Sequence, residues 1–148
     1  MLDHYKILID KADYDLVKRS TWKIDSTGYA KATIHRKKCY MHRLILEAKP
    51  HVGTDHINGN KIDNRRANLR PCNKHENAAN MKKRDGCSSK YKGVVYDKQS
   101  HAYKAEIESY HKLHHLGRFD NEVDAAIAYN KAAPFYFGEF AKLNNVSA

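Results

Sequence analysis

The first half of the chain alternates short apolar and polar stretches, a pattern typical of small strands and brief helices. Two alternating segments, 22–24 and 29–34, flank the Ser-Thr-Gly sequence at 26–28 and predict a β-hairpin. This half also predicts a strand at residues 5–9 and one or two helical turns at 13–19. A helix is predicted at 40–48, where Pro50 ends it.

The second half has a more regular pattern, with three consecutive strands followed by a helix. The strands are predicted at residues 91–96, 102–108 and 112–119. Asn121 is a favourable N-cap for the helix, because acidic residues follow it in the first turn. Small residues let this helix lie close to the sheet, and its predicted inner face consists of Ala125, Ala126, Tyr129, Ala132 and Ala133. Pro134 predicts that the helix kinks or ends near Ala133.

Composition and charge narrow the class of protein. The chain of 148 residues carries 27 Lys and Arg against 17 Asp and Glu, a net charge of +10, which indicates a polyanionic partner. We find no apolar run long enough for a membrane span and no signal-peptide pattern at Met1, so we expect an intracellular, cytoplasmic protein. Three cysteines without a Cys-x-x-Cys pair argue against a disulfide framework or a cysteine zinc site.

A polar stretch near residue 85 predicts the domain boundary. Residues 1–80 carry 16 basic and 9 acidic side chains, a net of +7, whereas 81–148 carry 11 and 8, a net of +3. We predict an α+β protein with one domain at 1–84, a linker at 85–90, and a second domain at 91–148 in which a three-stranded antiparallel sheet packs on one helix.

The segment from Thr54 to Asn77 has the strongest chemical pattern. The side chains of the neighbouring residues Asp55 and His56 diverge in an extended backbone, so one can bind a metal while the other faces a substrate. A strand, loop, strand and helix over this segment would bring both together with Asn68 and Asn77, and Asn73 with Glu76 is a capping-box pattern at the start of that helix. The oxygens of Asp55 and Asn77 suit a hard cation such as Mg²⁺, with Mn²⁺ as the alternative, and an imidazole beside it suits activation of water.

The sequence motif in this segment resembles that of the HNH homing endonucleases of phages and introns, which have the ββα-metal nuclease fold. The matching residues are the segments 41–45 and 55–70, followed by Asn77 and Asn80. The resemblance implies that His56 is the general base, that Asn68 holds the base-bearing loop, and that Asp55 and Asn77 bind the metal. The basic side chains Arg65, Arg66 and Arg70 are candidates for DNA phosphate contacts, and His42 is interpreted as structural.

A second resemblance covers about 60 residues of the C-terminal half. The segments Ser88–Val94, Ala105–Ile107, His115–Asp120, Asp124–Asn130 and Phe137–Asn144 are similar to the Apetala-two (ethylene-response-factor) DNA-binding domain. The resemblance implies that the exposed face of the sheet enters the major groove. The candidate DNA contacts are Lys92, Lys98, Lys104, Lys112, His115 and Arg118. Val95 stands where plant members of the family have an Arg, so their base preference does not transfer.

Together these patterns predict a metal-dependent endonuclease that acts on double-stranded DNA. The resemblance implies 5′-phosphate and 3′-hydroxyl products and a phage or prophage gene in a bacterial host cell. A membrane role is not indicated, and no protein partner is evident. The alternatives are a non-catalytic DNA-binding or regulatory protein that has the same basic surfaces, and an RNA-binding accessory protein.

Overall fold

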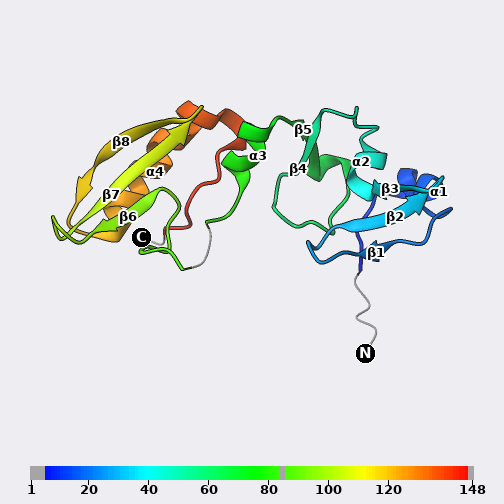
Figure 1. Cartoon of the computed structure of the whole chain (residues 1–148), viewed down its shortest axis with the longest axis horizontal. Helices are drawn as coiled ribbons and strands as arrows, with labels where there is room; N and C mark the ends of the chain where they lie inside the picture. The colour runs from blue at the N-terminus through cyan, green and yellow to red at the C-terminus, as the bar shows by residue number, and fades with distance from the viewer. Residues whose placement is uncertain (1–5, 84–85, 147–148) are drawn as a thin grey trace. The chain divides into compact units, whose positions relative to one another are not determined.

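The computed structural model describes residues 6–83 and 86–146, and the chain divides into two compact units (Figure 1). The N-terminal unit is Met1–Asn77 and the C-terminal unit is Ala78–Ala148. The division lies near the predicted linker, but residues 84 and 85, at the predicted boundary, lie outside the described part of the chain. The predicted linker at 85–90 therefore stays a prediction.

The N-terminal unit begins with short elements around one sheet. They are the 3-10 turn η1 (Lys11–Asp13), α1 (Tyr14–Val17), β1 (Lys23–Ile24), β2 (Ala30–Ile34), β3 (Lys37–Tyr40) and α2 (Met41–Ile45). The three strands are antiparallel in the order β1-β2-β3. The hairpin predicted around 26–28 is confirmed as β1 and β2, and Gly28 takes a positive φ of 85° in its turn.

Other predictions for this unit were wrong in detail. Leu8 forms one isolated parallel bridge with Asp63 instead of a strand over 5–9, of which Tyr5 is not described. The predicted helix over 40–48 is reduced to α2, because Tyr40 belongs to β3. Strand β3 was not predicted, since its first residues are two lysines and the tight turn before it contains no glycine.

The core of the N-terminal unit joins these short elements to the segment that follows. Its buried residues are Val17, Ala30, Met41, Ile45 and Leu69. The indole of Trp22 packs against this cluster and donates to the Val17 carbonyl at 2.9 Å. Leu69 lies outside the first sheet, so its burial anchors the next hairpin to the same core.

That hairpin consists of β4 (Gly53–His56) and β5 (Leu69–Cys72), with the 3-10 turn η2 (Arg66–Asn68) before β5. Helix α3 (Lys74–Asn80) follows β5 directly. The predicted capping box is confirmed, because the Glu76 N–H donates to Asn73 Oδ1 at 2.8 Å and the Asn73 N–H to Glu76 Oε2 at 2.7 Å. The order strand, loop, strand, helix is therefore as predicted for residues 54–77.

The C-terminal unit is one antiparallel sheet with one long helix. Its elements are β6 (Val94–Asp97), β7 (Ala102–Ser109), β8 (Lys112–Phe119), α4 (Glu122–Phe137) and the 3-10 turn η3 (Gly138–Phe140). The strands pair in the order β6-β7-β8, and a bulge lies between Ala105 and Glu106. The first strand starts three residues later than predicted, because Tyr91, Lys92 and Gly93 form a turn.

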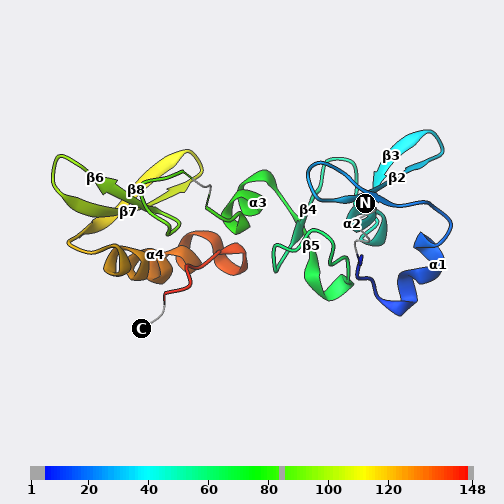
Figure 2. The same cartoon turned by 90° about the horizontal axis from the view of Figure 1, so that it is seen from below.

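Helix α4 lies along one face of this sheet (Figure 2). Asn121 caps it as predicted, accepting the Asp124 N–H at 2.8 Å. Ala125, Ala126 and Ala133 are fully buried, so the predicted small-residue face is confirmed. The helix does not end near Ala133, as one alternative predicted, but continues through Pro134 to Phe137.

The whole described chain is thus mixed α and β, with three small antiparallel sheets. Within residues 6–83 and 86–146, no helix combines the length and the apolar character that crossing a bilayer requires.

Candidate active site

The β4–β5 hairpin places Asp55 and His56 at the end of a strand that is buried there. Asp55 pairs in register with Arg70, and His56 with Leu69. Only 6% of Asp55 and 4% of His56 is exposed to solvent. A buried carboxylate and a buried imidazole in succession are costly, so their partners decide what each can do.

His56 is held in its neutral form by its surroundings. Burial lowers its pKa, and a hydrogen bond to Asn64 together with the charge of Asp55 opposes that shift without cancelling it. His56 Nε2 lies 3.4 Å from Asn64 Oδ1. Because an amide oxygen only accepts, this contact favours the tautomer that carries the proton on Nε2.

Aromatic rings enclose the His56 imidazole on other sides. The His42 ring packs edge-on at 5.1 Å between centroids, and the Tyr29 ring lies at 5.8 Å. His42 is itself only 7% exposed, and burial is the main cause that lowers its pKa to about 4, with electrostatic interactions with His56 and Arg43 as smaller causes. His42 is therefore a neutral packing partner of His56.

Asn68 braces the loop that connects β4 to η2. Its Nδ2 donates to the Asp63 carbonyl at 2.8 Å, and its Oδ1 accepts the Asn58 N–H at 2.9 Å. Gly59, with φ of 75°, supplies the turn in this loop and donates its N–H to the His56 carbonyl at 2.8 Å. The loop that follows the histidine is thus fixed from both ends by one asparagine side chain.

Asp55 is paired with a buried arginine. Arg70 donates to Asp55 Oδ2 from Nε at 2.9 Å and from Nη2 at 2.8 Å, and only 10% of its side chain is exposed. Asn77 lies on α3, which directly follows the partner strand of Asp55, and its side chain is exposed. A carboxylate and an accessible amide oxygen are suitable donors for a hard cation, and the pairing of these two residues as metal ligands stays a prediction.

The comparisons with known proteins bear on this arrangement. No model of a known protein family matches the chain. A protein of Acanthamoeba polyphaga mimivirus, named an uncharacterized HNH endonuclease, is 30% identical over 95% of this chain and 74% of its own length. The chain belongs to the HNH endonuclease family.

Two of the three candidate phosphate-binding arginines brace the N-terminal unit itself. Arg65 pairs with Asp63, whose pKa its guanidinium helps to lower to about 2. Arg66 donates to both oxygens of Asp13 at 2.7–3.1 Å. Half of each arginine side chain remains exposed, so both still present a cationic face to solvent.

The candidate DNA contacts of the C-terminal unit separate into two groups. Lys92 lies inside the unit, where Nζ donates to the carbonyls of Ala78, Ala79 and Met81. Its ammonium group is therefore used within the unit, and the predicted DNA contact of Lys92 stays a prediction. The others lie on the strands and the β6–β7 turn of the sheet, and they are Lys98, Lys104, Lys112, His115 and Arg118.

Register places part of the second group on the sheet face opposite α4. Lys104 is the partner of Arg118, and Glu106 is the partner of His115. Lys104 Nζ pairs with Asp97 at 2.7 Å, and His115 Nδ1 lies 3.0 Å from Glu106. This outward strand face, formed by Lys104, Glu106, His115 and Arg118, therefore mixes both signs of charge.

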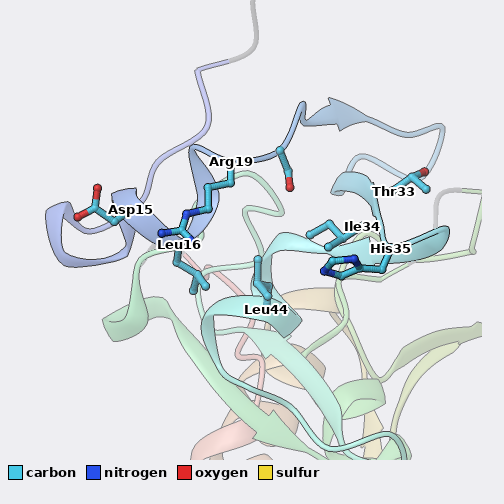
Figure 3. Close-up of a pocket in the computed structure, with 8 residues that line it drawn as sticks. Asp15, Leu16, Arg19, Thr33, Ile34, His35 and Leu44 are labelled. Atoms are coloured by element: carbon cyan, nitrogen blue, oxygen red, sulfur yellow. The ribbon is translucent and has the colours of Figure 1, made fainter.

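The N-terminal unit also has a cavity away from its candidate site. A hollow of about 760 Å³ lies between α1, the end of β2 and α2, where Leu16, Ile34 and Leu44 line it (Figure 3). Asp15 and Arg19 stand at its edge. None of the residues predicted for catalysis or metal binding lines this hollow.

Sequence reasoning missed two residues that contact His56. Asn64 is fully buried, and its position eight residues after the histidine in an asparagine-rich loop was interpreted only as part of the motif string. Tyr29 comes from the β1–β2 hairpin, 27 positions before His56 in the chain. A signal existed for Asn64, because a polar residue must be satisfied when the loop folds inward, but none existed for Tyr29.

Proposed function

We propose that this protein is a divalent-metal-dependent HNH endonuclease that hydrolyses phosphodiester bonds in double-stranded DNA. The observation that carries the proposal is the state of His56. It is a buried imidazole whose pKa is lowered by burial and whose Nε2 lies 3.4 Å from Asn64 Oδ1, on a hairpin that also carries Asp55. A neutral imidazole with an oriented lone pair is the form that a general base requires.

In the proposed reaction the His56 imidazole removes a proton from a water molecule as that water attacks phosphorus. The P–O3′ bond breaks, the phosphate stays on the 5′ end, and the 3′-oxygen takes a proton to become a hydroxyl. Asn68 keeps the loop after His56 in place, so the imidazole keeps its direction during the step. The tilt of His56 is fixed further by His42 and Tyr29.

Asp55 and Asn77 would hold the metal ion, which we expect to be Mg²⁺, or Mn²⁺ in its place. When bound, the ion would stabilise negative charge on the phosphate and on the leaving oxygen. Arg70 keeps the Asp55 carboxylate oriented through two hydrogen bonds and supplies one positive charge beside it. Removing this arginine would leave a buried carboxylate without its partner.

The C-terminal unit would tether the nuclease unit to its target. Its sheet-and-helix arrangement supports the proposal of an Apetala-two-like module whose outward strand face meets the major groove. Lys98, Lys112 and Arg118 are exposed on this unit and would contact phosphates. Binding by one unit raises the local concentration of DNA at the other.

A plasmid-cleavage assay tests the enzymatic proposal. Supercoiled plasmid is incubated with the wild-type protein and Mg²⁺ or Mn²⁺, beside His56→Ala and the exposed-histidine control His51→Ala. We expect metal-dependent nicking or linearisation by the wild type and the control, and a loss of at least about a hundredfold in rate for His56→Ala. A wild-type protein that binds the plasmid but does not cleave it with any of several metals and target DNAs would instead be a non-catalytic DNA-binding protein.

A further inference from the structure

Five lysines surround one cavity in the C-terminal unit. The cavity has a volume of about 640 Å³, and its walls include Lys82, Lys83, Lys90, Lys92 and Lys142 together with Tyr91. We name this hollow, with the five lysines that line it, the lysine cavity. It is formed by the segment before β6 and by the segment after η3, so it is distinct from the outward strand face on β7 and β8.

Two of the five lysines are fixed in place by backbone carbonyls. Lys83 Nζ donates to the carbonyls of Tyr91 at 2.7 Å and Val94 at 2.6 Å. Lys92 Nζ donates to three carbonyls at the end of α3. Carbonyl oxygens satisfy the donors of an ammonium group but leave its full positive charge in place.

The charges of these lysines oppose one another. Burial is the main cause that lowers the pKa of Lys92 to about 8, and the charge of Lys142 lowers it further. Burial also lowers the pKa of Lys83. Forming such a cluster therefore costs free energy, which a bound anion would recover.

The cavity lacks an internal counter-charge of matching size. None of the described residues that line it is acidic. Glu122 is near enough to act on Lys83 and Lys90, but its carboxylate already accepts the Lys90 N–H at 3.0 Å and a hydrogen bond from the Ser89 side chain. By contrast, Arg65, Arg66 and Lys104 each pair directly with a carboxylate.

We propose that the lysine cavity binds phosphate groups of the duplex DNA backbone, as a second DNA contact of the C-terminal unit. Lys82, Lys90 and Lys142 carry no hydrogen bond from their ammonium groups to described residues, so they can reach a phosphate. Lys90 lies with Nζ 5.0 Å from the centroid of the Tyr91 ring, which limits its movement at the cavity wall. Lys83 and Lys92 add fixed charge behind them.

Duplex DNA is the ligand that the rest of the molecule favours. A cluster of ammonium groups recognises charge without base identity, which suits the continuous phosphates of a backbone. This inference rests on the proposed function for the identity of the polyanion. It differs from that proposal in placing a phosphate contact away from the strand face that would enter the major groove.

The test uses the full chain without a divalent metal, so that binding is measured apart from cleavage. The variants are Lys90→Ala/Lys142→Ala, the charge-conserving Lys90→Arg/Lys142→Arg, and Lys131→Ala, an exposed lysine of α4 outside the cavity. Lys83 and Lys92 stay unchanged, because they hold the backbone. Equal thermal unfolding of all variants establishes that the alanine pair keeps the fold.

Affinity for a fluorescent duplex is measured over a range of salt concentrations. We expect the alanine pair to lower affinity severalfold and to reduce the slope of log K against log salt by about 0.9 for each phosphate that the protein no longer neutralises. The arginine pair and Lys131→Ala should keep the wild-type slope. A folded alanine pair with wild-type affinity and slope would overturn the proposal.

Two further measurements distinguish a membrane ligand from DNA, and the phosphate contact from the nuclease activity. Vesicles of phosphatidylserine and phosphatidylcholine are titrated with the same variants, and a loss of vesicle binding with an unchanged DNA slope would assign the cavity to a membrane surface and overturn the proposal. Plasmid cleavage by the wild type is scored separately. Cleavage that fails while the lysine-dependent salt slope is present would refute the nuclease proposal and keep the phosphate contact.

Discussion

At the scale of single residues, the surroundings of His56, the proposed general base, set its protonation state and its direction. The imidazole has Asn64 on one nitrogen and two aromatic rings against its faces and edges. Each partner comes from a different element, so no short motif contains the whole environment. The histidine motif gives the residue type, while these contacts set its protonation state and its direction.

His42 makes the stability of the N-terminal unit sensitive to acid. Its pKa is about 4 in the folded protein and near 6.5 when unfolded, so the unfolded chain binds more protons between these values. Stability contributed by neutral His42 is present above pH 6.5 and falls as the pH decreases toward 4, by about 3 kcal/mol in all. Burial lowers the pKa of His56 too, so it acts in the same direction.

The variant His42→Leu tests this, with the exposed His51→Leu as control. We expect the free energy of unfolding of His42→Leu to depend less on pH between 7 and 4 than that of the wild type. Fluorescence of Trp22, the single tryptophan, reports unfolding of the unit that contains His42. Parallel pH curves for wild type and His42→Leu would show that His42 is not the acid-sensitive group.

At the scale of elements, close contact between β6, β7 and α4 depends on one glycine. Gly93 precedes β6 with φ of 71°, and a Cβ at this position would lie 2.0 Å from the Tyr129 ring and 2.7 Å from the Glu106 carbonyl. Tyr129 is nearly fully buried, so its ring has no room to move away. The Lys-Gly-Val sequence before the strand is therefore a packing requirement.

Gly93→Ala should destabilise the C-terminal unit by about 3 kcal/mol or more, through both overlap and backbone strain. Gly86→Ala is the matched control, because Gly86 also has a positive φ, of 80°, but nothing lies within 4 Å of the added carbon. The control should cost about 1 kcal/mol. In thermal unfolding followed by far-UV circular dichroism, Gly93→Ala should lower the transition temperature, while the transition temperature reported by Trp22 fluorescence should not change. Equal effects of the two substitutions would contradict the packing argument.

At the scale of the whole molecule, two units with separate cores divide the charge unequally. The residues 1–80 carry +7 and 81–148 carry +3. On the outward strand face of the second unit Lys104 pairs with Asp97 and Glu106 lies beside His115, so negative side chains offset part of its positive charge. Binding by that face should thus depend on shape and specific contacts more than on bulk charge.

A double substitution tests the tether at this scale. Lys112→Ala/Arg118→Ala removes two exposed cations from β8, whereas Lys131→Ala removes one from α4. We expect plasmid cleavage by the β8 variant to fall about tenfold at limiting enzyme and to recover at high enzyme concentration, because the nuclease unit is unchanged. Equal loss at every enzyme concentration would mean that these residues do not act through affinity.

The sequence by itself determined the order of the elements around the site, the capping box of α3, the N-cap of α4 and the identity of the HNH motif. Each of these depends on residues within a few positions of one another, where the hydrophobic period and the side-chain chemistry predict the local structure. Only the tertiary structure decided the contacts of Tyr29 and His42 with His56, the pairing of Arg70 with Asp55, and the hydrogen bonds of the Lys92 ammonium group to backbone carbonyls. These depend on which distant segments share a core, and burial, which sets protonation and partners, exists only once the chain has folded.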